Sequence, residues 1–129
     1  MTHVTIIGGG PGGYEAALVA SRLGAAVTLI ERDGVGGSTV LTDCVPSKTL
    51  IATSDLLTEV GTAAELGVEV PRAVRADLAA VDARVLSLAK AQSDDIAARL
   101  ISSGITVIDG IAAINGPGAV TDVSEEIGR

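Results

Sequence analysis

The sequence feature that most constrains the fold is a glycine-rich run directly after a short apolar segment. Residues 4–7 are all β-branched, and a run of this kind predicts a buried strand. Gly8, Gly10 and Gly13 follow at the GxGxxG spacing, and a helical pattern opens immediately. Glycine at these positions permits a tight turn, close backbone approach to a pyrophosphate, and close packing of helix on strand. The run therefore predicts a strand–turn–helix unit whose free N–H groups form an anion site.

The next features along the chain extend this unit to a βαβ arrangement. Pro11 suits the first helical turn because an N–H there has no intrahelical acceptor. The apolar residues 26–30 predict a second strand, and Glu31 follows it. A carboxylate about 20 residues past the glycines is where a βαβ nucleotide site binds the ribose diol of an adenosine. Together these parts predict dinucleotide binding, and a solvated acid at a strand end is the alternative for Glu31 if the loop is empty.

Composition sets bounds on the domain count and on the partners. The chain has 129 residues, 47% of them apolar, which predicts one domain with a hydrophobic core. The net charge of −7 argues against a nucleic acid or an anionic membrane as partner. One histidine and one cysteine cannot build a zinc site or an internal disulfide, so we expect no metal and a reducing, cytoplasmic setting. Charged residues or glycine interrupt every long apolar stretch, so neither membrane insertion nor a signal peptide is expected.

The rest of the chain predicts alternating helices and strands. The expected elements are a loop over 34–43, a helix from about Ser47, a connection over 67–72 with at most a short strand at 68–70, a helix over about 75–103 capped by Gly104, a strand over 105–108, and a hairpin of 111–114 with 119–123. Residues 124–129 are polar and are expected to fray. The fold class is therefore α/β, a parallel sheet with helices followed by a C-terminal β-hairpin or meander.

Three segments carry a resemblance to a known family. The runs GGGPGGYEAALVA, VTLIERDGVGG and CVPSKTL together resemble the flavoprotein disulfide reductases, the pyridine nucleotide-disulfide oxidoreductases that include dihydrolipoyl dehydrogenase and glutathione reductase. The likeness spans essentially the whole chain and is most specific in residues 4–51. It implies a Rossmann-like FAD-binding domain, here incomplete, over residues 1–123. Spacing alone does not distinguish FAD from NAD, so the choice of FAD rests on the resemblance.

The resemblance also implies which residues hold the cofactor. The glycine loop would lie under the pyrophosphate, Glu31 on the adenosine ribose, and the backbone of 110–112 near the adenine. A second glycine pair would pass the cofactor. The cofactor-binding residues implied are Gly8, Gly9, Gly10, Pro11, Gly12, Gly13, Glu31, Arg32, Gly36, Gly37, Ser38, Thr39, Lys48, Ile111 and Ala112.

The redox motif of the family is only half present. The family has a cysteine pair after the paired glycines, and Cys44 matches the second, flavin-side cysteine. Thr39 stands where the first, substrate-exchanging cysteine belongs. A hydroxyl cannot form a disulfide, which excludes dithiol chemistry at this site. Asp43 replaces the usual glycine, and its charge disfavours a neighbouring thiolate, so a small buried filler is the alternative to a redox role for Cys44.

Lys48 is the other candidate catalytic residue. A lysine in the first turn of a helix opposes the helix dipole, which disfavours it unless a nearby group attracts a cation. In the family this lysine lies near the reactive edge of the flavin, where a half-buried ammonium would stabilise negative charge that develops on hydride arrival. The alternative is an ordinary surface lysine.

The resemblance bears on what else a complete enzyme needs. Family members are several-fold longer, with an NAD(P) domain and a dimerisation domain that have no counterpart here, so the chain alone is expected to be inactive. In the family's sheet the first strand is central, and without its later neighbour it becomes an edge. NAD(P)H would be the donor, and the complete enzyme would be a homodimer.

Three functions follow. The favoured one passes electrons from the flavin to a small-molecule acceptor other than a disulfide, most plausibly a quinone, because this chain resembles the branch that keeps CVPSK and lacks the first cysteine. The alternatives are a dihydrolipoyl-dehydrogenase-like enzyme and a non-catalytic FAD-binding fragment.

Overall fold

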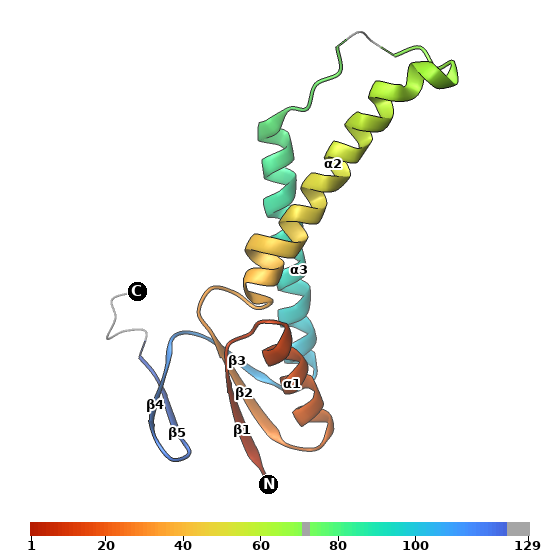
Figure 1. The fold of residues 1–129 in the computed structure, drawn as a ribbon. Coiled ribbons are helices and arrows are strands. Elements are labelled where there is room, and N and C mark those ends of the chain that lie inside the picture. The colour runs from red at the N-terminus through yellow and green to blue at the C-terminus, as the bar shows by residue number, and fades with distance from the viewer. Residues whose placement is uncertain (71–72, 124–129) are drawn as a thin grey trace.

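The computed structural model describes residues 1–70 and 73–123 and has an α/β body from which a pair of helices projects (Figure 1). The elements in chain order are β1 (His3–Ile7), α1 (Pro11–Arg22), β2 (Ala26–Glu31), a π-helical turn η1 (Thr39–Asp43), α2 (Cys44–Thr62), a 3-10 turn η2 (Ala63–Leu66), α3 (Leu78–Ser102), β3 (Thr106–Asp109), β4 (Ala112–Gly116) and β5 (Ala119–Asp122). The predicted α/β class is confirmed, including the C-terminal hairpin.

The body is a parallel sheet in the order β1-β2-β3 with both helices α1 and α3 packed on one face. Val27 and Leu29 alternate along β2 and therefore point to the same face. They join Leu18 of α1 and Leu100 of α3 in one buried cluster. The small residue Ala17 is also fully buried there, which brings α1 close to the sheet as its sequence predicted.

β1 lies at the edge of this sheet, as predicted. It pairs with β2 in parallel register, His3 with Ala26 and Ile7 with Ile30. Thr5 and Ile7 are exposed, whereas Val4 and Ile6 are half-buried. The prediction of a buried strand was therefore wrong for β1, because none of its residues is buried and it has a neighbouring strand on one side only among the described residues.

The predicted loop over 34–43 is shorter than expected. Residues Thr39–Asp43 form a π-helical turn, and α2 begins at Cys44 rather than near Ser47. The N–H of Cys44 donates to the carbonyl oxygen of Thr39, and the side chain of Val40 is buried. Burial of one apolar residue thus overrides the local preference of a Gly-, Ser- and Thr-rich segment for a loop.

The long helix α3 begins three residues later than the sequence suggested, at Leu78 rather than about Arg75. Asp77 is its N-cap, and the carboxylate of Asp77 accepts hydrogen bonds from the N–H groups of Ala79 and Ala80 at 3.0 and 3.2 Å. The helix ends at Ser102, and Gly104 follows with φ +76° as predicted for the C-terminal cap. Residues 68–70 form no strand, and the calls on residues 71, 72 and 124–129 lie outside the described residues.

The helices α2 and α3 run alongside one another and extend away from the sheet (Figure 1). No residue of α2 is buried, although the helix contains many apolar residues. The hairpin β4–β5 lies beside the body, with Ile114 opposite Val120 and an irregular register at Gly116.

No helix in the described parts of the chain is long and apolar enough to cross a membrane.

Candidate dinucleotide site

The candidate site lies where the three parallel strands end. At this edge the N–H of Gly8 donates to the carbonyl oxygen of Ile30 at 2.8 Å, and the N–H of Gly110 donates to that of Glu31 at 2.9 Å. The turns after β1 and β3 are thus both hydrogen-bonded to the end of β2. Ligands of open α/β sheets bind beyond the carboxyl ends of the strands, so the topology marks this edge for binding.

Gly8 and Gly13 are required by the backbone itself. Gly8 has φ +97°, a conformation that is strained for any residue with a Cβ atom. A methyl group on Gly13 would lie 1.9 Å from the carbonyl oxygen of Gly8. Helix α1 therefore starts in direct backbone contact with the turn that leaves β1.

Gly10 and Gly12 have no such internal reason to be glycine. A Cβ atom at either position would meet nothing within 4 Å, and Gly10 has the ordinary extended angles φ −66° and ψ 179°. No side chain caps the N-terminus of α1. The first N–H groups of this helix have no intrahelical acceptor and lie beside the open space at Gly10 and Gly12. A side chain at either position would enter this open space, and helix N-termini of this kind are sites where anions bind.

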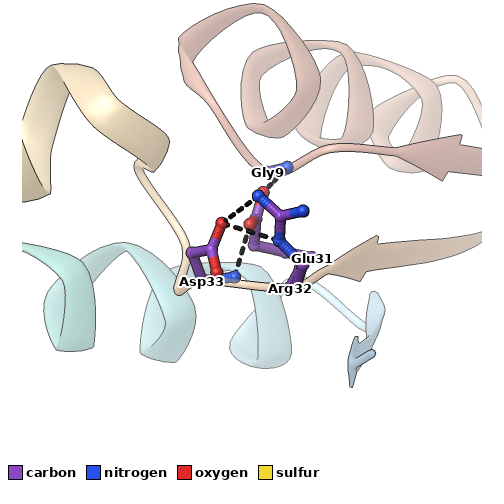
Figure 2. Close-up of polar contacts among 4 residues, drawn as sticks. All are labelled: Gly9, Glu31, Arg32 and Asp33. Atoms are coloured by element: carbon purple, nitrogen blue, oxygen red, sulfur yellow. Dashed lines mark hydrogen bonds and ion pairs between the residues drawn. The ribbon is translucent and has the colours of Figure 1, made fainter. Parts of the chain in front are cut away.

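Glu31 joins the end of β2 to the glycine loop (Figure 2). Its Oε2 accepts a hydrogen bond from the N–H of Gly9 at 2.5 Å, and its Oε1 accepts one from the N–H of Asp33 at 2.8 Å. Gly9 is buried against this side chain, since a methyl group there would lie 3.1 Å from the Cβ of Glu31. The half-buried Glu31 is therefore fixed in place and is not merely a solvated strand-end acid. Each carboxylate oxygen has a second lone pair, so a diol has acceptors.

Arg32 and Asp33 form an exposed ion pair beside Glu31 (Figure 2). The Nε and Nη2 atoms of Arg32 donate to Oδ2 of Asp33 at 2.8 and 2.7 Å. This hydrogen bond and the charge of Asp33 raise the pKa of Arg32 above its ordinary value. An exposed pair of this kind adds little stability, but it determines the direction of the Arg32 guanidinium at the rim of the site.

A cavity of about 220 Å³ opens at the ends of the strands. It brings together predicted site residues from distant parts of the chain, and its lining includes Gly8, Glu31, Arg32, Gly110, Ile111 and Ala112. Gly110 is buried beneath Asp122, because a methyl group on it would lie 2.6 Å from Oδ2 of that residue. The hairpin thereby helps to hold the 110–112 backbone next to Glu31.

The second glycine pair meets the first through backbone contacts. The N–H of Gly36 donates to the carbonyl oxygen of Gly9 at 2.8 Å. A methyl group on Gly37 would lie 3.1 Å from the Cα of Gly10. Both Gly36 and Gly37 have positive φ, +102° and +58°. Any side chain at Gly37 would press on the loop, so glycine keeps the two segments in contact.

The two redox positions of the family are neighbours in the fold. Thr39 and Cys44 are both half-buried and lie at the two ends of the π-helical turn, joined by the Cys44 N–H to Thr39 carbonyl hydrogen bond. Ser38 precedes this turn and is exposed. A hydroxyl and a thiol thus lie close together at the two positions that the resemblance assigns to the family's cysteine pair.

Lys48 departs from the expectation for it. It is exposed rather than half-buried, and it lies one turn inside α2, with η1 preceding the helix. The conflict with the helix dipole that was expected of a first-turn lysine is therefore small, because the dipole effect falls off within the first turn.

The sequence reasoning missed two residues that shape the site. Asp33 binds both Arg32 and the Glu31 carboxylate, and Ser93 of α3 donates to the carbonyl oxygen of Val35 at 2.6 Å. Ser93 belongs to a stripe otherwise formed by the buried residues Val85, Ala89 and Leu100. A polar residue in such a stripe was the available signal. No group of three metal-ligating side chains occurs among residues 1–70 and 73–123.

The family description "Pyridine nucleotide-disulphide oxidoreductase" matches residues 2–126. The chain belongs to this family, as its glycine and CVPSK motifs indicated.

Individual proteins of known name show which members of the family the chain resembles. The chain is 49% identical over 114 residues to the NAD(P)H dehydrogenase (quinone) of Mycobacterium tuberculosis, a match that covers 85% of this chain and 23% of that protein. It is 48% identical over 67 residues to a dihydrolipoyl dehydrogenase of Halobacterium salinarum, covering 52% and 14%. The crystal structure of LpdA from Mycobacterium tuberculosis matches with a TM-score of 0.85 and 43% identity over 98% of this chain and 28% of that one. The chain thus spans roughly a quarter of the first relative's length.

Proposed function

We propose that this chain is the FAD-binding part of an NAD(P)H-dependent flavin oxidoreductase that passes electrons to a quinone or another small-molecule acceptor that is not a disulfide. The observation that carries the FAD site is the open cradle at Gly10 and Gly12, whose glycines nothing inside the chain requires. Family membership supports FAD over other dinucleotides. The similarity to an NAD(P)H dehydrogenase (quinone) supports the acceptor class.

In this proposal the chain's own residues bind and orient the cofactor. The N–H groups at the start of α1 would bind the pyrophosphate beside Gly10 and Gly12. The carboxylate of Glu31 would accept hydrogen bonds from the hydroxyls of the adenosine ribose. The backbone of 110–112 lies along the adenine. Bound FAD supplies the chemistry, namely hydride acceptance from a nicotinamide and delivery of electrons to the acceptor.

Thr39 is the residue that separates the proposed function from disulfide chemistry. Electron transfer to a disulfide requires a thiolate that attacks it. With one cysteine in the chain, Cys44 has no partner thiol in its own chain. Lys48 and Cys44 are assigned to the flavin side of the site through the family's motif, Lys48 as the cation near the ring and Cys44 as its neighbour. A cytoplasmic location and a homodimer of the complete enzyme belong to the same proposal.

The FAD site is tested by refolding the chain with FAD, desalting it, and recording the visible spectrum before and after addition of NADH. We expect a retained flavin spectrum that NADH leaves unchanged, because the described residues contain a single glycine fingerprint and it is assigned to FAD. Loss of flavin on the column contradicts an FAD site, and bleaching by NADH contradicts the absence of a donor site here.

The acceptor class is tested with the same loaded chain. After photoreduction under anaerobic conditions it is mixed with a soluble quinone or with oxidised lipoamide. We expect reoxidation by the quinone and none by lipoamide. Reoxidation by lipoamide would instead favour the dihydrolipoyl-dehydrogenase-like alternative, which similarity to the Halobacterium salinarum protein motivates.

The variant Thr39→Cys tests whether residue 39 lies where the family has its first cysteine. The backbone hydrogen bond from Cys44 to residue 39 brings the two positions close together, so mild oxidation is expected to join them in a disulfide. Thiol titration should then find no free thiol in the oxidised variant, which should remain a monomer, whereas the wild type keeps its single thiol. Two free thiols after oxidation would contradict the proposed correspondence of Thr39 with the family's first cysteine.

A further inference from the structure

Helix α3 holds the second glycine segment from behind. The hydroxyl of Ser93 donates to the carbonyl oxygen of Val35 at 2.6 Å, across a sequence separation of 58 residues. Ser93 is 8% exposed and Val35 is 6% exposed. Ser93 is the buried polar residue of the described part of the chain, and no other polar side chain there is buried to this degree.

The peptide group that Ser93 binds is the one that binds the glycine loop. The carbonyl of Val35 and the N–H of Gly36 belong to a single planar unit. Ser93 binds the carbonyl end of this unit, and the N–H end donates to the carbonyl oxygen of Gly9 at 2.8 Å. Because the unit is rigid, fixing its carbonyl end also fixes the direction of the Gly36 N–H, which donates to the carbonyl oxygen of Gly9.

Gly9 transmits this constraint to the site. Its own N–H donates to Glu31 at 2.5 Å, and the next residue, Gly10, lies where a methyl group on Gly37 would be 3.1 Å away. A rotation of the 35–36 peptide would therefore release the Gly9 carbonyl and change the approach of Gly37 to Gly10. Both changes occur at the cradle assigned to the pyrophosphate.

We propose that Ser93 is a positioning residue of the dinucleotide site, which holds the 35–36 peptide so that the two glycine segments form one rigid cradle. This inference rests on the proposed FAD site. Ser93 binds Val35 and is not among the residues that line the cavity at the strand ends, so it acts through Val35, Gly36 and Gly9. A serine that only satisfied a buried carbonyl would affect folding and leave the cofactor affinity of the folded chain unchanged.

The test compares three substitutions in the full chain. Ser93→Ala removes the hydroxyl, Ser93→Thr keeps it, and Ser87→Ala makes the same chemical change at an exposed position of the same helix. The FAD dissociation constant is measured by quenching of flavin fluorescence under conditions in which circular dichroism shows each variant to be folded. In parallel, the hydrogen exchange rate of the Gly36 amide is measured by NMR without FAD.

We expect Ser93→Ala to weaken FAD binding about tenfold and to accelerate exchange of the Gly36 amide. Ser93→Thr should recover most of the affinity, and Ser87→Ala should match the wild type. If Ser93→Ala does not fold, Ser93→Cys takes its place, because a thiol is a weak donor of similar size, and the same loss of affinity is expected.

Two results would overturn the inference in different ways. A folded Ser93→Ala chain with the wild-type dissociation constant and Gly36 exchange rate would show that the residue is structural only, with the FAD site intact. A wild-type chain that binds no FAD would overturn the proposed function and this inference with it.

Discussion

The sheet body and the projecting helical pair contain the same apolar residue types but bury them very differently. In the body, Leu29 and Leu100 are fully buried, whereas Leu56 of α2 and Leu86 of α3 are each 59% exposed. Helix α3 carries both kinds of side chain, because Val85, Ala89 and Leu100 are buried along one face, whereas Leu86 on another face is exposed. Within the described residues of the projecting pair, only α3 has a side-chain cap, at Asp77, and α2 has none, whereas the candidate site lies where the chain packs.

The cavities follow the same division. The groove between α2 and α3 has a volume of about 470 Å³ and is lined by residues such as Thr53, Leu56 and Val81. The hydroxyl of Thr53 there already donates to a carbonyl of its own helix. The cavity at the strand ends is smaller and is bordered by Glu31, Arg32 and Asp33 and by the turns after β1 and β3. Polar side chains of both helices line the groove as well, among them Thr49, Thr53 and Arg84, but at the strand ends a carboxylate, that of Glu31, is hydrogen-bonded to the glycine loop.

The largest expected effect is on the free energy of unfolding, when one buried and one exposed leucine of helix α3 are each truncated to alanine. Leu100→Ala should lower the free energy of unfolding by about 2–5 kcal/mol, because a fully buried leucine leaves a cavity. Leu86→Ala should change it by no more than about 0.5 kcal/mol. Urea unfolding followed by circular dichroism measures both, and equal losses would contradict the division of α3 into a packed and an exposed face.

A smaller effect is expected when the charge of a carboxylate is removed in each region. Glu31→Gln keeps the size of the side chain but weakens the acceptor that binds the N–H groups of Gly9 and Asp33. Hydrogen bonds to charged groups are the stronger ones, so the free energy of unfolding should fall by about 1–2 kcal/mol. FAD binding should weaken about tenfold. Glu59→Gln on the exposed surface of α2 is the control. If both variants lose the same unfolding free energy and FAD affinity, the role assigned to Glu31 is contradicted.

The smallest effect is expected at an exposed ion pair on α3. Lys90 donates to Asp94 at 2.5 Å, one helical turn away, with both side chains largely exposed. Lys90→Ala should lower the free energy of unfolding by no more than about 0.5 kcal/mol, and added salt should abolish the difference. A larger loss that salt does not reduce would mean that this surface of α3 is packed against something else.

The elements that depend on local pattern were predictable from the sequence, and several of the predicted site residues line one cavity at the strand ends. Gly8, Gly13 and Gly104 lie where their backbone requirements place them, because each states a local geometric need. The start of α2 was missed since burial of Val40 decides it. Ser93 was missed because its partner is 58 residues away. The exposure of Lys48 depends on what surrounds the helix, which its motif does not encode.

The most direct test of the central claim compares two glycine-to-alanine substitutions. At Gly10 and at Gly61 of α2 a Cβ atom would meet nothing within 4 Å, and neither has a positive φ. Both variants should therefore fold, Gly61→Ala with a slight gain because alanine favours a helix. We predict that Gly61→Ala binds FAD like the wild type, whereas Gly10→Ala weakens binding about 10- to 100-fold, because its methyl group occupies the space assigned to the pyrophosphate. Equal FAD dissociation constants for the two folded variants would contradict the assignment of this loop as the cofactor cradle.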